Sequence, residues 1–166
     1  MAAAFIAIAA VLLLGAGIGK VLAPDPASDA LGALGLPSHP SLVRIGALVE
    51  CLLAATALLV SSMAVQVLLG CSYLAFAVFV ALLRRQPSAM SCGCFGGEGE
   101  LPSLRHVVVN LALAAGCLLA AATGSSSLVA LLRADSVTGL ATALLSACGA
   151  WIVVLLLRGG TEAMST

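Results

Sequence analysis

The sequence predicts an all-α polytopic membrane protein, a bundle of apolar helices that carries one short polar segment. Of its 166 residues 62% are hydrophobic and 8% are charged, and the mean hydropathy is +1.21. Five apolar runs of about twenty residues follow one another, each long enough to cross a bilayer as a helix. The seven basic and seven acidic residues cancel. Without a basic field we expect no nucleic-acid partner, and the composition places the chain among membrane lipids.

The first predicted helix covers residues 2–22 and contains one cation, Lys20, near its end. A cleaved signal peptide carries its positive charge before the apolar region, so we expect this helix to be retained. Residues 23–41 contain four prolines and several glycines and aspartates, which predicts a turn-rich loop. Within this loop we expect one short helical turn over residues 28–34, ending at Gly35.

The second and third predicted spans, residues 42–60 and 63–83, are joined by a tight turn at two serines. Glu50 lies in the second span, roughly two helical turns or about 9 Å beyond Arg44, which marks the membrane surface. A carboxylate at that depth is costly unless it is paired or protonated, so Glu50 is a candidate functional residue. The alternative is a structural ion pair that fixes helix register. Lys20 and Arg105 are the candidate partners in either case.

The polar segment at residues 84–103 contains Ser91-Cys92-Gly93-Cys94-Phe95-Gly96-Gly97. Two cysteines separated by one glycine can meet, but their disulfide would close a small and strained ring, which favours exchange over a structural role. The other four cysteines lie inside apolar runs and are expected to act as small hydrophobic residues: Cys51, Cys71, Cys117 and Cys148.

Two other interpretations of Cys92 and Cys94 remain open. They could be idle thiols in a stiffened loop. They could also belong to a zinc site, but the pair supplies only two of the four ligands that zinc takes, and the remaining candidates are His39 and His106. We favour redox chemistry and expect no metal.

The fourth predicted span, residues 104–123, begins after Pro102-Ser103, a pattern typical of a helix start. Its first turns carry Arg105, His106 and Asn110. His106 and Asn110 share one helical face with Cys117, and we expect this polar stripe to face the bundle or a ligand. The alternative places His106 at the membrane interface and has Asn110 bonding to a neighbouring helix.

Residues 124–158 are predicted to form a linker and a fifth span, Val137 to Leu157, and residues 159–166 a disordered tail. Trp151 is expected to pack or to lie at the interface. The predicted organisation is a four-helix membrane domain over residues 1–123, with the redox loop at 84–103, followed by the linker and the fifth helix.

Several motifs occur in an order that resembles the MauE family of methylamine-utilisation proteins, which is related to DoxX-like membrane proteins. They are Gly-Ile-Gly-Lys20 at the end of the first helix, Glu50 in the second, Cys92-Gly-Cys-Phe-Gly96 after the third, and Arg105 to Asn110 opening the fourth. The resemblance covers about residues 3–122. It implies a four-helix DoxX/MauE-like core in the cell (inner) membrane.

The resemblance further implies a thioredoxin-like partner and disulfide chemistry outside the cytoplasm. In methylamine-utilisation clusters the family is linked to maturation of the disulfide-rich small subunit of methylamine dehydrogenase. By carry-over Cys92 and Cys94 would be the redox pair, and Lys20, Glu50 and Arg105 would support it together with Asn110.

The charge distribution favours the opposite orientation. With five spans, six basic residues fall on the face that carries the redox loop and only Arg133 falls opposite. The positive-inside rule would then place the loop in the cytoplasm. We favour the extracytoplasmic placement that the resemblance implies.

Three functions are compatible with these features. The first is a membrane thiol–disulfide oxidoreductase whose electrons leave through a quinone near His106 and Asn110, or through an intramembrane cysteine such as Cys51 or Cys117; the sequence does not decide between these routes. The second is a non-enzymatic anchor or assembly subunit for a redox or maturation partner. The third is a small-solute carrier with Glu50 as its intramembrane charge. We favour the first, because it alone explains the cysteine spacing.

Overall fold

The computed structural model describes residues 2–86, 102–124 and 127–158, which contain seven helices and no strand. Five of the helices are long and apolar enough to cross a membrane. They are α1 (Ala2–Leu22), α3 (Pro40–Leu59), α4 (Met63–Leu83), α5 (Leu104–Thr123) and α7 (Ser136–Arg158). The predicted all-α bundle of five spans is confirmed, with the third and fourth spans at the expected bounds.

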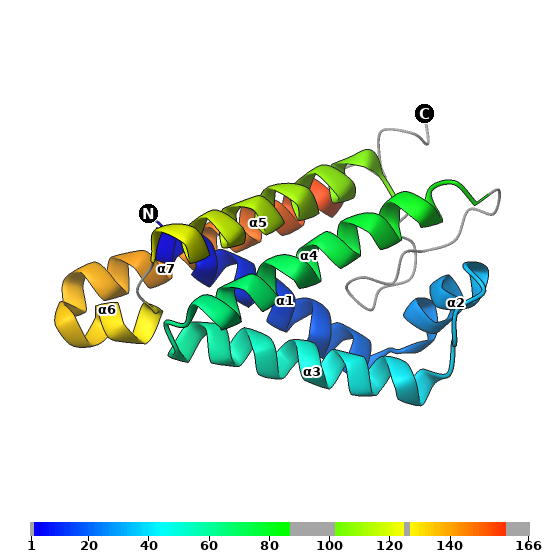
Figure 1. Ribbon diagram of the computed structural model, residues 1–166, viewed down its shortest axis with the longest axis horizontal. Coiled ribbons are helices and arrows are strands. Elements are labelled where there is room, and N and C mark those ends of the chain that lie inside the picture. The colour runs from blue at the N-terminus through cyan, green and yellow to red at the C-terminus, as the bar shows by residue number, and fades with distance from the viewer. Residues whose placement is uncertain (1, 87–101, 125–126, 159–166) are drawn as a thin grey trace.

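The long helices run alternately along the longest axis of the molecule (Figure 1). The N-terminus of α1, the α3–α4 turn and the α5–α7 connection lie at one end, which we call the amino end. The α1–α3 connection, the end of α4 and the start of α5 lie at the other, which we call the loop end because residues 87–101 join α4 to α5 there. Residues 87–101 of the predicted redox loop and the predicted tail at 159–166 lie outside the described residues.

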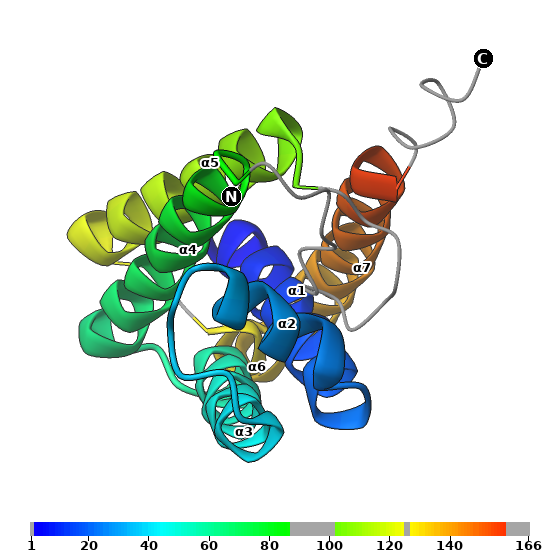
Figure 2. The same ribbon diagram turned by 90° about the vertical axis from the view of Figure 1, so that its right-hand side faces the viewer.

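Helix α1 lies at the centre of the bundle and contacts each of the other four long helices. Figure 2, viewed along the bundle, shows α3, α4, α5 and α7 arranged around it. The main hydrophobic core accordingly joins Ile6, Leu12 and Leu13 of α1 to Leu69 of α4 and Leu113 of α5. Large apolar side chains on the outer helix faces are exposed, as is required of surfaces that contact lipid.

Glycines allow close helix contacts in this core. A Cβ on Gly17 of α1 would lie 2.6 Å from Cys51 Sγ and 3.0 Å from the Ala47 carbonyl oxygen of α3. A Cβ on Gly70 of α4 would lie 3.0 Å from Leu118 of α5. Small residues at such contacts are typical of membrane helix pairs, because van der Waals packing rather than water exclusion drives their association.

The loop predicted at residues 23–41 contains more helix than expected. Helix α2 (Asp25–Ala33) starts three residues before the predicted turn, because Pro26 is tolerated in a first turn and Ala27 and Ala30 are buried. It ends at Ala33, one residue before the end of the predicted turn, and Gly35 follows with a φ of +70° that suits glycine.

A second short helix leads from α5 into the fifth span, which packs directly on α1. Helix α6 (Leu128–Ala134) begins at Ser127, whose Oγ accepts a hydrogen bond from Ala130 N, in a stretch predicted to be only a connection. Ser146 of α7 then donates from Oγ to the Ala4 carbonyl of α1 at 3.2 Å. Helix α7 therefore completes one side of the central helix.

Candidate functional site

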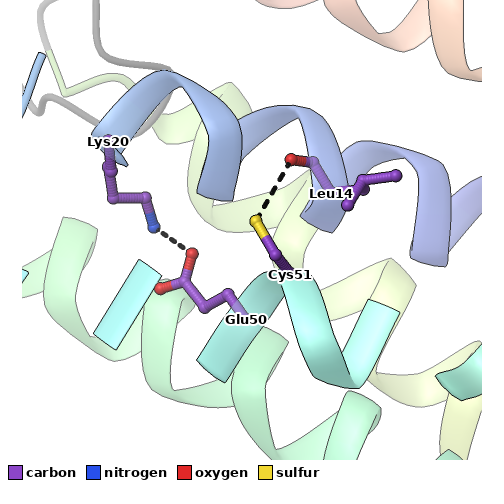
Figure 3. Close-up of polar contacts among 4 residues, drawn as sticks. All are labelled: Leu14, Lys20, Glu50 and Cys51. Atoms are coloured by element: carbon purple, nitrogen blue, oxygen red, sulfur yellow. Dashed lines mark hydrogen bonds and ion pairs between the residues drawn. The ribbon is translucent and has the colours of Figure 1, made fainter. Parts of the chain in front are cut away.

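An ion pair joins the central helix to α3 at the loop end of the bundle. Lys20 Nζ lies 2.5 Å from Glu50 Oε2, and the two side chains are 10% and 19% exposed (Figure 3). Helical side chains lean toward the N-terminus of their own helix. Because α1 and α3 are antiparallel, Lys20 leans into the membrane and Glu50 leans toward the loop end, so that they meet.

Glu50 is therefore paired, as both interpretations of an intramembrane carboxylate require, and its partner is Lys20 rather than Arg105. The carboxylate lies ten residues beyond Pro40, about 15 Å into α3 at 1.5 Å per residue. Arg105 is exposed on α5.

An aromatic side chain of α4 completes the environment of the lysine. The Phe76 ring centroid lies 4.6 Å from Lys20 Nζ, a distance at which the ring face attracts a cation. Tyr73, one turn earlier, packs edge-on against Phe76 with centroids 6.2 Å apart. Its hydroxyl donates to the Ala9 carbonyl of α1 at 2.6 Å, which fixes α4 against the central helix.

The ion pair faces a cavity of about 760 Å³ bounded by α1, α2, α3 and α4. Apart from Lys20, Glu50 and Cys71, its lining is apolar. Several lining leucines and Val78 are also exposed on the surface of the bundle, so the cavity opens sideways between α3 and α4. Its volume falls within the range of about 300–1,000 Å³ that is typical of small-molecule sites.

A second and much smaller cavity lies on the other side of Phe76. It measures about 40 Å³ and is lined by His106, Asn110 and Tyr73, among others, while Lys20 and Phe76 line both cavities. About 30 Å³ is the share of one water molecule in liquid water. The space beside His106 and Asn110 is therefore too small for the quinone that the sequence analysis considered there.

The predicted polar stripe of α5 does face the bundle. His106 is buried, its Nδ1 lies 2.7 Å from Ser103 Oγ, and Cys117 is completely buried. Asn110 is half-buried, and its Nδ2 donates to the His106 carbonyl one turn earlier at 2.8 Å. His106 and Asn110 thus line the small cavity, Cys117 lies in the main hydrophobic core, and Asn110 bonds within its own helix.

Cys51 lies one residue after Glu50, against α1. Its Sγ is 4.0 Å from the Leu14 carbonyl oxygen, a long contact for a weak thiol donor (Figure 3). Together with Gly17 this contact sets the close approach of α1 and α3. Cys117 is buried in the core, whereas Cys71 and Cys148 are exposed on outer faces.

Of the candidate site residues, the structure brings together Lys20 and Glu50, and places His106 and Asn110 beside the same lysine across Phe76. Cys92 and Cys94 lie outside the described residues. His39 caps α3, with Nδ1 accepting from Ser41 N at 3.3 Å. Within the described ranges no group of three His, Cys, Asp or Glu side chains is placed to hold a metal ion.

Sequence reasoning missed Phe76 and Tyr73. A signal was present, because a tyrosine in the middle of an apolar span must find a hydrogen-bond partner for its hydroxyl. The position of Phe76 relative to the lysine depends on how α4 packs on α1, which helical periodicity alone does not give.

Chemically, the ion-pair site offers an ammonium donor, a carboxylate acceptor and an aromatic face at the edge of an apolar cavity. Such a site can hydrogen-bond a polar head group and can exchange a proton with it, while apolar walls accept a hydrophobic tail.

No curated protein and no solved structure gave a match to this chain. The family model described as methylamine utilisation protein MauE matches residues 1–124, which include α1 to α5 and the cysteine pair. That match covers about three quarters of the sequence and agrees with the resemblance carried by the Lys20, Glu50 and cysteine motifs. The protein is therefore a multi-span membrane protein of the MauE family.

Proposed function

We propose that this protein is a membrane thiol–disulfide redox protein, which exchanges disulfides through Cys92 and Cys94 with a thioredoxin-like partner during extracytoplasmic protein maturation. The observation that carries the proposal is the Cys-Gly-Cys sequence in the polar segment between two membrane spans of a MauE-family chain. A pair at this spacing is suited to rapid opening and closing.

In the exchange, a thiolate of the partner attacks one sulfur of the Cys92–Cys94 disulfide and forms a mixed disulfide. The partner's second thiolate then attacks the sulfur that the partner contributed to the mixed disulfide. The partner leaves oxidised, and Cys92 and Cys94 leave as two thiols, so two electrons and two protons have moved into this protein.

Charges support the proposal from the loop end of the bundle. Arg84 and Arg85 at the end of α4, and Arg105 at the start of α5, are exposed there, next in sequence to the cysteine segment. Nearby cations stabilise a thiolate over a thiol, and so favour release of the Cys92 or Cys94 thiolate when the partner attacks the disulfide.

The test is labelling of Cys92 and Cys94 in intact cells with a membrane-impermeant maleimide, before and after mild reduction. The variant used carries alanine at the other four cysteines, because Cys71 and Cys148 are exposed and would react in detergent. We expect that both cysteines are labelled only after reduction, and that labelling does not require permeabilisation of the membrane. Labelling that requires permeabilisation would place the pair in the cytoplasm and contradict an extracytoplasmic role.

Single Cys92→Ser and Cys94→Ser variants then test the chemistry. Each is expected to abolish disulfide exchange with a reduced thioredoxin-like protein while leaving the amount of protein in the membrane unchanged. If both variants keep exchange, the redox mechanism is wrong. If both lose exchange but keep cellular function and partner binding, the protein is an anchor or assembly subunit instead.

A further inference from the structure

We propose that the cavity between α3 and α4 binds an isoprenoid quinone, with the quinone head group against Lys20, Glu50 and Phe76 and the tail leaving between the two helices. The inference rests on the proposed function for its purpose, since a protein that accepts two electrons from a dithiol must release them to an acceptor. The binding site itself is argued from geometry alone.

The charge state of the site selects a neutral head group. Lys20 and Glu50 neutralise each other at 2.5 Å, so the site has no net positive charge with which to hold an anionic phospholipid head group. A quinone is uncharged and presents carbonyl oxygens. The lysine ammonium has three N–H donors, one of which reaches Glu50, and it lines the cavity from its inner wall.

The aromatic ring of Phe76 adds a planar surface beside that donor. It lies 4.6 Å from Lys20 Nζ and is held by the edge contact with Tyr73. Quinonoid rings can pack edge-on or offset against such an aromatic side chain. The acyl chain of a bulk lipid could fill the apolar part of the cavity, but it would offer no acceptor to the ammonium N–H groups that do not reach Glu50.

The opening of the cavity suits a long apolar tail. Exposed side chains of α3 and α4 line it, including Leu42, Leu74 and Val78, and these lie on membrane-spanning helices. A ligand can therefore enter from the bilayer without crossing water, which a water-insoluble quinone requires.

Combined with the proposed exchange, the chemistry balances. The Cys92 and Cys94 thiols lose two electrons and two protons and form one S–S bond, and the quinone gains both electrons and both protons, one on each oxygen, to become a quinol. Glu50 is an acceptor through which one of these protons can pass.

A substitution at Gly46 tests whether the quinone binds in this cavity. Gly46 lines the cavity, and a Cβ there would meet no atom within 4 Å, so Gly46→Phe is expected to add a ring at the cavity wall without a clash at its Cβ. Gly15→Phe is the matched control, because a Cβ on Gly15 also meets no atom within 4 Å and Gly15 does not line the cavity.

The experiment uses full-length protein in nanodiscs, in the Cys92→Ser/Cys94→Ser background, with a photoreactive azido-ubiquinone of short tail and unlabelled decylubiquinone as competitor. Crosslinks are expected on the α3 and α4 peptides around Gly46 and Cys71, at least tenfold weaker in Gly46→Phe, unchanged in Gly15→Phe and competed by decylubiquinone but not by added phospholipid. Crosslinks spread over all lipid-facing helices and insensitive to Gly46→Phe would show acyl chains only and overturn the inference.

The two proposals fail separately. Quinone binding in the cysteine variant, with no thiol-dependent quinone reduction by the protein with its native cysteines, would leave the cavity assignment and refute the redox role. Disulfide exchange without any site-specific quinone crosslink would leave the redox role and refute the cavity assignment.

Discussion

Neutralising Lys20 or Glu50 singly should destabilise the bundle, whereas neutralising both should cost much less than the sum. The two side chains are 10% and 19% exposed, so a lone charge would face apolar surroundings. Breaking a buried pair costs about 3–5 kcal/mol, and insertion scales give an upper value of about 2.5–3.5 kcal/mol for one charge at the centre of a membrane helix. We therefore expect Lys20→Met to lower the free energy of unfolding by about 3 kcal/mol.

Glu50→Gln should cost less, about 2 kcal/mol, because the lysine keeps its Phe76 ring, worth about 0.5–2 kcal/mol, and lies near the end of α1. The double variant leaves no unpaired charge, and a loss of about 2 kcal/mol is expected from imperfect packing. The coupling energy is then about 3 kcal/mol, well above the value of about 0.5 kcal/mol at which sites count as independent.

The assay is equilibrium unfolding in dodecyl maltoside micelles with rising SDS, followed by far-ultraviolet circular dichroism. Arg105→Met is the control, because Arg105 is exposed and its loss should change the unfolding free energy by no more than about 0.5 kcal/mol. Single-variant effects on Lys20 and Glu50 that simply add in the double variant would refute the pairing.

Three further predictions concern packing and capping. Gly17→Ala should lower the unfolding free energy by about 1–3 kcal/mol through overpacking, and Gly15→Ala should not lower it, as measured in the same SDS titration. Tyr73→Phe should cost about 0.6–1.7 kcal/mol by removing a hydrogen bond between helices, and an unchanged titration midpoint would contradict this bond. Hydrogen bonds from the Thr138 hydroxyl and from nearby backbone amides hold the pKa of Asp135 below its ordinary value. A depressed folded pKa stabilises the start of α7 above the unfolded pKa, and this stabilisation is lost as the pH falls through the folded pKa. The protection factor of the Thr138 amide, which compares its exchange rate with the intrinsic rate at the same pH, should therefore be high at pH 6–7 and fall below about pH 4 in the native chain, but stay constant in Asp135→Asn.

Much of this architecture was predictable because membrane helices are dictated by length and hydropathy. The α4 and α5 bounds follow from apolar runs that end at Arg84 and begin after Pro102, and a helix satisfies the backbone hydrogen bonds within each run. Helices α2 and α6 were underestimated, because short helices depend on caps and on burial of alanines such as Ala30, and neither is visible in hydropathy.

The candidate site was predictable in part for the same reason. A charge inside an apolar span must be paired, so Glu50 and Lys20 stand out in the sequence. The contribution of Phe76 and the large cavity could not be predicted, since both depend on how far α3 and α4 separate toward the loop end. That separation is set by the packing of α2 and by the close contact of Gly17 with α3.

The central position of α1 also bears on how the protein is made. Helix α1 is synthesised first, so the surface that later contacts four helices initially faces lipid. Many of its contact residues are alanine or glycine, whose exposure to lipid before the other helices insert costs little free energy. Glu50 follows Lys20 by thirty residues, so the ion pair can close as soon as α3 inserts. We expect the bundle to assemble from the inside outward in the order of translation, with the α1–α3 hairpin as the template on which α4, α5 and finally α7 settle.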